Sequence, residues 1–280
     1  MACGIFMSPF RLLHILTIGE ADLPETTKEK KKVEIVILTA FGVGGATVLG
    51  AVIGLIFKRT TKSFNDAALS VAAGVMLAAA MLGLILPSLE YGGRYGIITT
   101  VIGIFAGAVS INLLDRLALR CFDKSILRDK SSSFDRLRQV TLFVMAIAIH
   151  NLPEGIAAGV GFGGGNISEG IFIATAIALQ NIPEGMAVII AMLDVGISRG
   201  RTFMIAALTG VVEIVGTFIG YFAVNISLAI LPFVLAFAGG NMLYVIAEEM
   251  IPTTHSEDTA GSTYFVLGGF CLMLFFSVIL

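Results

Sequence analysis

The sequence predicts an all-α, polytopic membrane protein: a bundle of eight transmembrane helices without a separate soluble domain. Of the 280 residues, 56% are hydrophobic and only 14% are charged, whereas soluble domains usually carry about 25% charged residues. The mean hydropathy is +0.94, well into the apolar range. Eight apolar stretches are long enough to cross a hydrocarbon core of about 30 Å, which takes about 20 helical residues.

The expected helices follow one another with polar or glycine-rich breaks between them. They cover residues 34–57, 67–89, 95–119, 140–162, 168–193, 202–224, 226–252 and 262–280. We expect residues 34–280 to form one eight-helix domain, with a loop at 121–139. Residues 1–33 are expected to be an N-terminal tail. Its apolar part is broken by Pro9, Arg11 and His14, which favours an interfacial helix over a signal peptide.

Small residues recur along the first helices, as in "GVGGATVLGAVIG" and "AAGVMLAAAMLG". Small residues four apart let helices approach closely in lipid, so we expect most of them to serve packing. The glycine-rich faces are also compatible with a homodimer. Cys3, Cys121 and Cys271 are far apart in the sequence, which indicates isolated thiols rather than a disulfide framework or a thiolate metal site.

The distribution of positive charge predicts the orientation. With eight crossings both termini lie on one side, and twelve of the 18 Lys and Arg fall on the other. Positive charge collects in cytoplasmic loops, so both termini are expected to be extracytoplasmic, although the run "KEKKK" before the first helix argues the other way. The net charge of −2 gives no indication of nucleic-acid binding. We expect a bacterial cytoplasmic membrane, because no organelle signal is evident.

Two similar polar motifs interrupt the fourth and fifth helices: "AIAIHNLPEG" and "AIALQNIPEG". His150 and Glu154 are four residues apart, so both project from one helix face. Pro153 removes a backbone donor, which is expected to kink the helix and free a carbonyl oxygen. Antiparallel neighbouring helices would bring both motifs to the same depth, near the membrane midplane. The second motif offers Gln180, Asn181 and Glu184 there, and the first also offers Asn151.

A carboxylate at the midplane costs about 2.5 kcal/mol or more, and no Lys or Arg is expected at that depth. The compensating charge must therefore come from protons or a bound cation. Glu, His, Asn and Gln supply ligands that divalent metals accept. Glu213 on the sixth helix adds a third carboxylate, for which protonated packing is the alternative reading. Met76 and Met81 could add a thioether, although core filling is the commoner role of methionine.

These residues resemble the ZIP (Zrt/Irt-like) family of divalent metal transporters. "HNLPEG" in the fourth helix and "QNIPEG" in the fifth carry the resemblance, with "AAGVM", "LLDR" and "EEMIP" elsewhere. Gln180, where many members have His, is similar to the GufA-like branch and its ZIP11-type relatives. The resemblance covers residue 34 to the end. It implies a binuclear midplane site that moves Zn²⁺, or Fe²⁺, Mn²⁺ or Cd²⁺, into the cytoplasm, with metal as substrate and no separate cofactor.

The resemblance also implies residue roles. One metal position would use Met76, His150, Glu154, Gln180 and Glu184, and the neighbouring position Asn151, Glu154, Asn181, Glu184 and Glu213. Many members have aspartate at the place of Asn181, so this chain has one charge fewer at the second position. Asp115, Glu248 and Glu249 would receive the metal on its inner exit path. Residues 121–139 contain no histidine, so no metal capture is expected in that loop, and His255 is expected to be a surface residue.

We expect metal to bind at the midplane and one helix group to shift against another to open the inner path. Protonation of His150, Glu154 and Glu184 must compete with the metal, so acid on the entry side should weaken uptake. Two alternatives remain at this point. A proton-driven transporter of another solute would need Glu154, Glu184 and Glu213 but not His150. An intramembrane metallohydrolase is disfavoured, and no enzyme is expected, because the helices hold one histidine and no HExxH motif.

Overall fold

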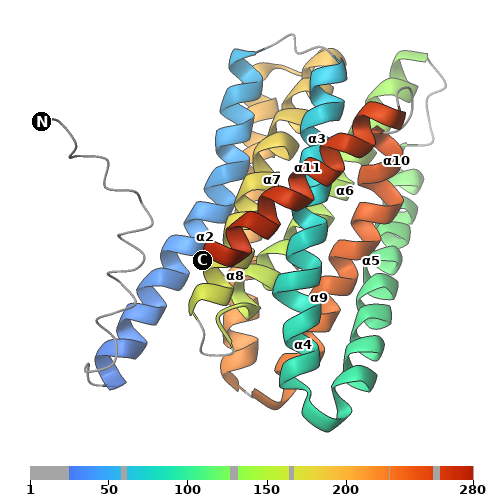
Figure 1. Ribbon diagram of the computed structural model, residues 1–280. Helices are drawn as coiled ribbons and strands as arrows, with labels where there is room; N and C mark the ends of the chain where they lie inside the picture. Colours follow the sequence, from blue (N-terminus) through green and yellow to red (C-terminus); the bar gives the residue numbers. More distant parts are fainter. Residues whose placement is uncertain are drawn as a thin grey trace, which may run out of the picture.

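A computed structural model of the chain describes residues 25–57, 62–126, 132–163, 167–226, 228–254 and 259–279. These residues form helices and turns, with no strand among them (Figure 1). The predicted tail up to residue 24, including Cys3, lies outside the described residues, and so does His255. The all-α prediction is confirmed for the part of the chain that the structure describes.

Eight helices in this part are long and apolar enough to cross a membrane, as predicted. In chain order they are α2 (Glu25–Ile56); α3 (Lys62–Ala78) continued by η1 (Ala79–Ile85) and α4 (Leu86–Tyr91); α5 (Gly96–Ile126); α6 (Ser132–Val160); α7 (Ile167–Asp194); α8 (Arg199–Ile226); α9 (Leu231–Val245) continued by η4 (Ile246–Met250) and α10 (Ile251–Thr254); and α11 (Thr259–Ile279). Single 3₁₀ turns, η2 (Gly93–Tyr95) and η3 (Leu228–Ile230), precede α5 and α9.

Three helices extend beyond the apolar stretches that predicted them. α2 begins at Glu25, so the end of the expected tail is helical, and α5 and α6 extend through most of the expected loop at 121–139. Lys, Arg, Glu and Leu are good helix formers, so a helix can continue past its apolar stretch into a charged segment. Hydropathy finds the apolar stretch and not the end of the helix.

The helices form two groups. The first group comprises α2, α6, α7 and α8, and the second comprises α3, α5, α9 and α11 with the short elements that continue them. The most extensive packing is within the groups, in the pairs α2–α7, α6–α8, α5–α9 and α3–α11. Figure 1 shows α11 running obliquely across α3. Between the groups lies an apolar cluster rich in alanine, which includes Ala79, Ala158, Ile173 and Ala176.

Glycines bring helix backbones together inside the first group, and they do so in symmetric pairs. Gly50 lies against the carbonyl of Ile182, and Gly216 lies in the same way against that of Leu152. Gly44 and Gly210 face each other directly. Each contact position in α2 therefore has an equivalent 166 residues later in α8. Each contact position in α6 has an equivalent 30 residues later in α7. Since each crossing reverses direction, α2 and α8 are antiparallel, and the group is an inverted repeat about a pseudo-two-fold axis.

The same spacing relates the two π-helical segments. η1 interrupts the second membrane span and η4 the seventh, at positions about 166 residues apart. π-helical turns rotate the side chains that follow and occur often at functional sites. η4 carries Glu248 and Glu249, of which Glu248 is exposed and Glu249 half-buried. The altered turn therefore gives the two neighbouring carboxylates different surroundings.

Candidate metal site

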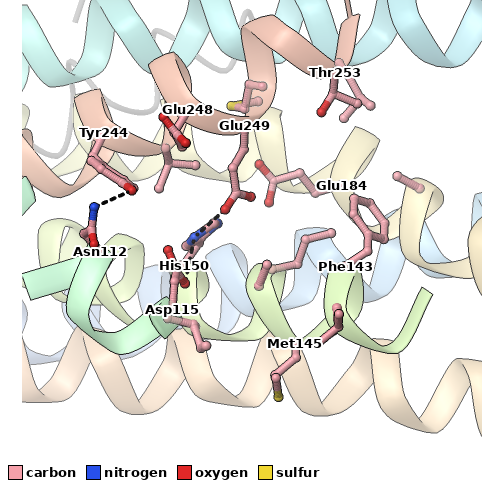
Figure 2. Close-up of a pocket in the computed structure, with 18 of the residues that line it drawn as sticks. Asn112, Asp115, Phe143, Met145, His150, Glu184, Tyr244, Glu248, Glu249 and Thr253 are labelled. Atoms are coloured by element: carbon pink, nitrogen blue, oxygen red, sulfur yellow. Dashed lines mark hydrogen bonds and ion pairs between the residues drawn. The ribbon is translucent and has the colours of Figure 1, made fainter. Parts of the chain in front are cut away.

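A cavity of about 550 Å³ lies at the end of the bundle where α5 ends and α6 begins. Its walls come from both helix groups: α6 and α7 from the first, and α5, α9 and η4 from the second. Figure 2 shows its polar side chains converging from these helices. Those labelled in Figure 2 are Asn112, Asp115, His150, Glu184, Tyr244, Glu248, Glu249 and Thr253, and Arg116 also lines the cavity.

His150 is the centre of a three-residue cluster in this cavity. Its Nε2 atom lies 3.3 Å from Glu249 Oε1 and 3.7 Å from Asp115 Oδ1 (Figure 2). One ligand atom from each residue can be chosen so that all three lie within 4.8 Å of one another, which is close enough to share a metal ion. The His150 side chain is 5% exposed, against 20% for Asp115 and 33% for Glu249. The cluster therefore joins a buried imidazole to partly solvated carboxylates.

A second layer lies deeper than the cavity wall. Glu154 is buried and accepts a 2.6 Å hydrogen bond from Gln180 Nε2 at its Oε1. Its other oxygen, Oε2, has no partner, and neither does Gln180 Oε1. Glu184, in the equivalent position of α7, is also buried and lines the cavity. The two motif glutamates thus face different surroundings, one inside the first group and one at the cavity.

Glu213 forms a third layer with no exposure at all. Its Oε1 accepts a 2.8 Å hydrogen bond from the Thr47 hydroxyl and another from Asn151 Nδ2. Its Oε2 accepts a 2.6 Å hydrogen bond from Asn181 Nδ2, which also reaches the Val43 carbonyl. Every polar partner of this carboxylate is therefore a side-chain donor of the first helix group.

The buried atoms without a hydrogen-bond partner in these layers are all electron-pair donors. They are His150 Nε2, Asn151 Oδ1, Glu154 Oε2, Gln180 Oε1, Asn181 Oδ1 and Asp115 Oδ1. Leaving such atoms unpaired in a buried site costs free energy, and natural structures rarely do so without a reason. Oxygen and imidazole nitrogen atoms are the ligands that divalent metal ions accept. This donor set fits a cation.

The charges of the buried glutamates also indicate a bound cation. Glu154, Glu184 and Glu213 are buried in membrane spans, and among the described residues no lysine or arginine forms an ion pair with them. His150 is the one basic side chain in the three layers, and it already faces Asp115 and Glu249. Buried charges in proteins are normally paired or bound to metal. A positive ion would supply the missing charge.

The structure brings most of the predicted residues together, but with other partners than the sequence suggested. His150 faces Asp115 and Glu249, two of the expected exit residues, so one residue of the first motif contacts both of them. Glu248 lines the cavity but lies outside that cluster. Met76 is fully buried in the apolar cluster between the groups and is not a cavity residue, and Met81 is 37% exposed.

Sequence reasoning missed Thr47 and the Asn112–Tyr244 pair. Asn112 Nδ2 donates a 2.9 Å hydrogen bond to the Tyr244 hydroxyl at the cavity wall (Figure 2). A signal for Thr47 was present: "GGATVLGAVIG" and "GVVEIVGTFIG" place Thr47 and Glu213 three residues after one glycine and three and seven residues before two others. No comparable pattern marks Asn112 or Tyr244.

Comparison with known proteins identifies the family of the chain. Residues 129–277 match the family described as "ZIP Zinc transporter". The chain is 33% identical over 242 residues to Zinc transporter GufA of Myxococcus xanthus, covering 82% of this chain and 93% of the relative. It is 34% identical over 243 residues to Zinc transporter ZIPB of Bordetella bronchiseptica, with 82% and 76% covered.

A human protein, Zinc transporter ZIP11, is 29% identical over 301 residues, with 77% of this chain and 88% of the relative covered. GufA and ZIP11 are thus both among the relatives, as the resemblance of the second motif implied. Together with the eight apolar helices, these matches make the chain an integral, multi-pass membrane protein that belongs to the ZIP family of zinc transporters.

Proposed function

We propose that the protein carries divalent transition-metal ions, Zn²⁺ first among them, across the membrane through the layered site. The main support for this proposal is a set of buried oxygen and nitrogen atoms that have no hydrogen-bond partner. These atoms extend from Asn181 to the cavity at His150. Zinc accepts imidazole nitrogen and carboxylate oxygen together, which suits His150 with Asp115 and Glu249. The relatives' names, zinc transporters in each case, favour the same substrate and a transporter rather than an enzyme.

The ligand roles form part of the proposal. A metal at the midplane would use the motif side chains Glu154, Gln180 and Glu184, and then move to the cluster of His150, Asp115 and Glu249. His150 can serve both places, since it lies one helical turn from Glu154 and also faces the exit carboxylates. Met76 as a further ligand and a second metal bound by Asn151, Asn181 and Glu213 remain predictions from the family resemblance.

The route across the membrane follows from the two helix groups. The deeper layers belong to the first group, whereas Asp115 and Glu249 belong to the second, so a shift between the groups would change the distance between them. The boundary is lined largely by apolar side chains, many of them alanines, and we expect the groups to slide along it. The positive-inside rule places the cavity on the cytoplasmic side, with both termini outside, and we expect the cell membrane as the location.

The test is uptake of radioactive Zn²⁺ into proteoliposomes by the wild type and by a Glu154→Gln/Glu184→Gln variant. The expected result is saturable uptake and bound zinc in the wild type, with both reduced at least tenfold in the variant. A tenfold loss corresponds to about 1.4 kcal/mol of binding or activation free energy, which one lost charged ligand readily exceeds. Uptake that survives in the variant at wild-type affinity would refute the site.

The same assay distinguishes zinc transport from the remaining alternative, a proton-driven carrier of another solute. Such a carrier would need the carboxylates but not His150, and zinc binding would be incidental. We expect His150→Gln to weaken zinc uptake as well, because His150 Nε2 is the nitrogen ligand of the cavity cluster. Acid on the entry side should also weaken uptake, since the ligands bind metal deprotonated.

A further inference from the structure

Thr47 contacts the midplane layers from a helix that no sequence motif implicated. It lies in the middle of α2 and is 1% exposed. Its hydroxyl donates to Glu213 Oε1 at 2.8 Å, across 166 residues of sequence. The inference that follows rests on the proposed transport function and concerns how its ligands are held.

The hydrogen bonds around Glu213 fix the direction of two amides. A carboxylate can only accept, so Asn151 and Asn181 must each present their Nδ2 group to it, and both do. The amide oxygens therefore point away from Glu213. Both oxygens, Asn151 Oδ1 and Asn181 Oδ1, are buried and have no partner. Glu213 in this arrangement holds two amides whose oxygens remain available to a cation.

The pseudo-two-fold axis identifies Thr47 as the counterpart of Glu213. The two residues are 166 positions apart, the spacing that relates the glycines of α2 to those of α8. The carbonyl of Glu213 lies against Gly155 of the first PEG motif, and the carbonyl of Thr47 lies against Gly185 of the second. Each motif glycine directly follows the motif glutamate in sequence. It contacts the backbone of the helix that carries Glu213 or Thr47.

We propose that Thr47 is a positioning residue of the metal site, acting through Glu213. Its hydroxyl anchors Oε1, so that the carboxylate holds the N–H groups of Asn151 and Asn181 and leaves their oxygens for the metal. Partners of this kind orient ligands that they do not replace, and losing one typically lowers metal affinity by about 10- to 100-fold. Thr47 itself donates its proton to Glu213 and does not bind the metal in this scheme.

The test compares Thr47→Val, which keeps the shape and removes the hydroxyl, with Thr47→Ser, which keeps the hydroxyl. The matched control is Thr217→Val. Thr217 is equally buried, and its hydroxyl donates at 2.9 Å to the backbone oxygen of Glu213 rather than to the carboxylate. For each variant, KM and maximal rate of Zn²⁺ uptake are measured in proteoliposomes, and Zn²⁺ affinity by equilibrium titration in detergent.

We expect Thr47→Val to raise KM and the dissociation constant by roughly tenfold, the lower end of the range for such partners. Thr47→Ser should restore both values, and Thr217→Val should leave both unchanged. The inference is overturned if Thr47→Val binds zinc like the wild type. It is overturned equally if serine fails to restore affinity, or if Thr217→Val loses as much, since the hydroxyl would then serve packing alone.

A double-mutant cycle keeps the inference testable if Thr47→Val is poorly stable. Glu213→Gln cannot accept from three donors, so it should weaken zinc binding in the same way as loss of the Thr47 hydroxyl. Combining Glu213→Gln with Thr47→Ala should then add no further loss of affinity, because residues acting through one network are not additive. Additive losses would refute the connection. A wild type that fails to take up zinc refutes the proposed function, whereas an unaffected Thr47 variant beside an active wild type refutes only this inference.

Discussion

His150 connects the buried layers to the open cavity, and the position of one nitrogen atom explains why. Its neighbours in sequence, Asn151 and Glu154, belong to the deeper layers, whereas its Nε2 faces carboxylates from α5 and η4. A metal released from Glu154 would therefore meet Asp115 and Glu249 without leaving His150. Glu249 lies nearer to the imidazole than Asp115 does, so it should matter most for release.

This ranking can be measured with Glu249→Gln. We expect the maximal rate of zinc uptake to fall by roughly tenfold, the effect of removing one charge-assisted interaction worth about 1.4 kcal/mol. Glu248→Gln should have a smaller effect, because Glu248 lines the cavity but lies outside the cluster. Initial rates over a range of zinc concentrations in proteoliposomes give the answer. Equal losses in the two variants would contradict the ranking and indicate a general effect of negative charge in the cavity.

That polar residues of the two motifs lie close together was predictable from the sequence, whereas their contact partners were not. His150, Glu154 and Glu184 were recognised because charge in an apolar helix requires compensation. The pairing of His150 with Asp115 and Glu249 depends on how α5 and η4 pack beside α6, and no spacing rule predicts this. Thr47 was missed for a related reason, since a lone threonine in a membrane helix is normally a packing residue.

At the scale of elements, the glycine of each PEG motif has a packing role that the motif alone does not reveal. A Cβ atom on Gly155 would collide with the backbone of α8 at Glu213, and one on Gly185 with the backbone of α2 at Thr47. Backbone atoms cannot rotate away as a flexible side chain can. The glycines therefore set the helix spacing at which Thr47, Asn151, Asn181 and Glu213 can meet.

Gly185→Ala tests this directly, with Gly45→Ala as the control. A Cβ atom on Gly45, in the membrane span of α2, would meet no heavy atom within 4 Å. Overpacking of this kind costs roughly 1–3 kcal/mol, so Gly185→Ala should lower the melting temperature in detergent and also weaken zinc binding. Gly45→Ala should be neutral or slightly stabilising, because alanine favours the helix. A Gly185→Ala protein as stable as the wild type would show that α2 can move away without cost.

The elements themselves were largely predictable, and their ends and irregular turns were not. The eight apolar stretches gave the number and approximate position of the spans, because lipid imposes a length and a polarity on each crossing. The π-helical segment η4 was beyond sequence reasoning. It contacts α3 and α9 and carries Glu248 and Glu249, and no spacing in the sequence marks its altered turn.

At the scale of the whole molecule, the contacts within the helix groups differ in kind from those between them. Within each group, glycines place backbone against backbone, as Gly44 does with Gly210 and Gly103 with Phe233 in α9. Between the groups, side chains meet side chains, as where Gly83 of η1 faces Ile173 of α7. Backbone contacts of the first kind resist displacement, whereas an apolar side-chain boundary can slide. We therefore expect the two groups to move as two bodies.

Cross-linking distinguishes the two kinds of contact. In a background with Cys3, Cys121 and Cys271 replaced by serine, a Gly83→Cys/Ile173→Cys pair would bridge the groups, because a Cβ on Gly83 would touch the Ile173 side chain. We expect the disulfide to reduce zinc uptake to background, and reductant to restore it. The control pair is Ser88→Cys/Thr100→Cys, because the Ser88 and Thr100 hydroxyl oxygens lie 2.7 Å apart between α4 and α5 inside the second group.

The control pair should cross-link without loss of uptake, since no movement is expected between α4 and α5. Equal inhibition by both disulfides would mean that any cross-link disturbs the bundle, and full uptake with the first disulfide formed would mean that the groups do not separate there. Zinc binding measured on the cross-linked proteins completes the argument. A protein locked across Gly83 and Ile173 should still bind zinc through the His150 cluster, because its cavity is open in this conformation. Binding without transport would place the required movement at the boundary between the two groups.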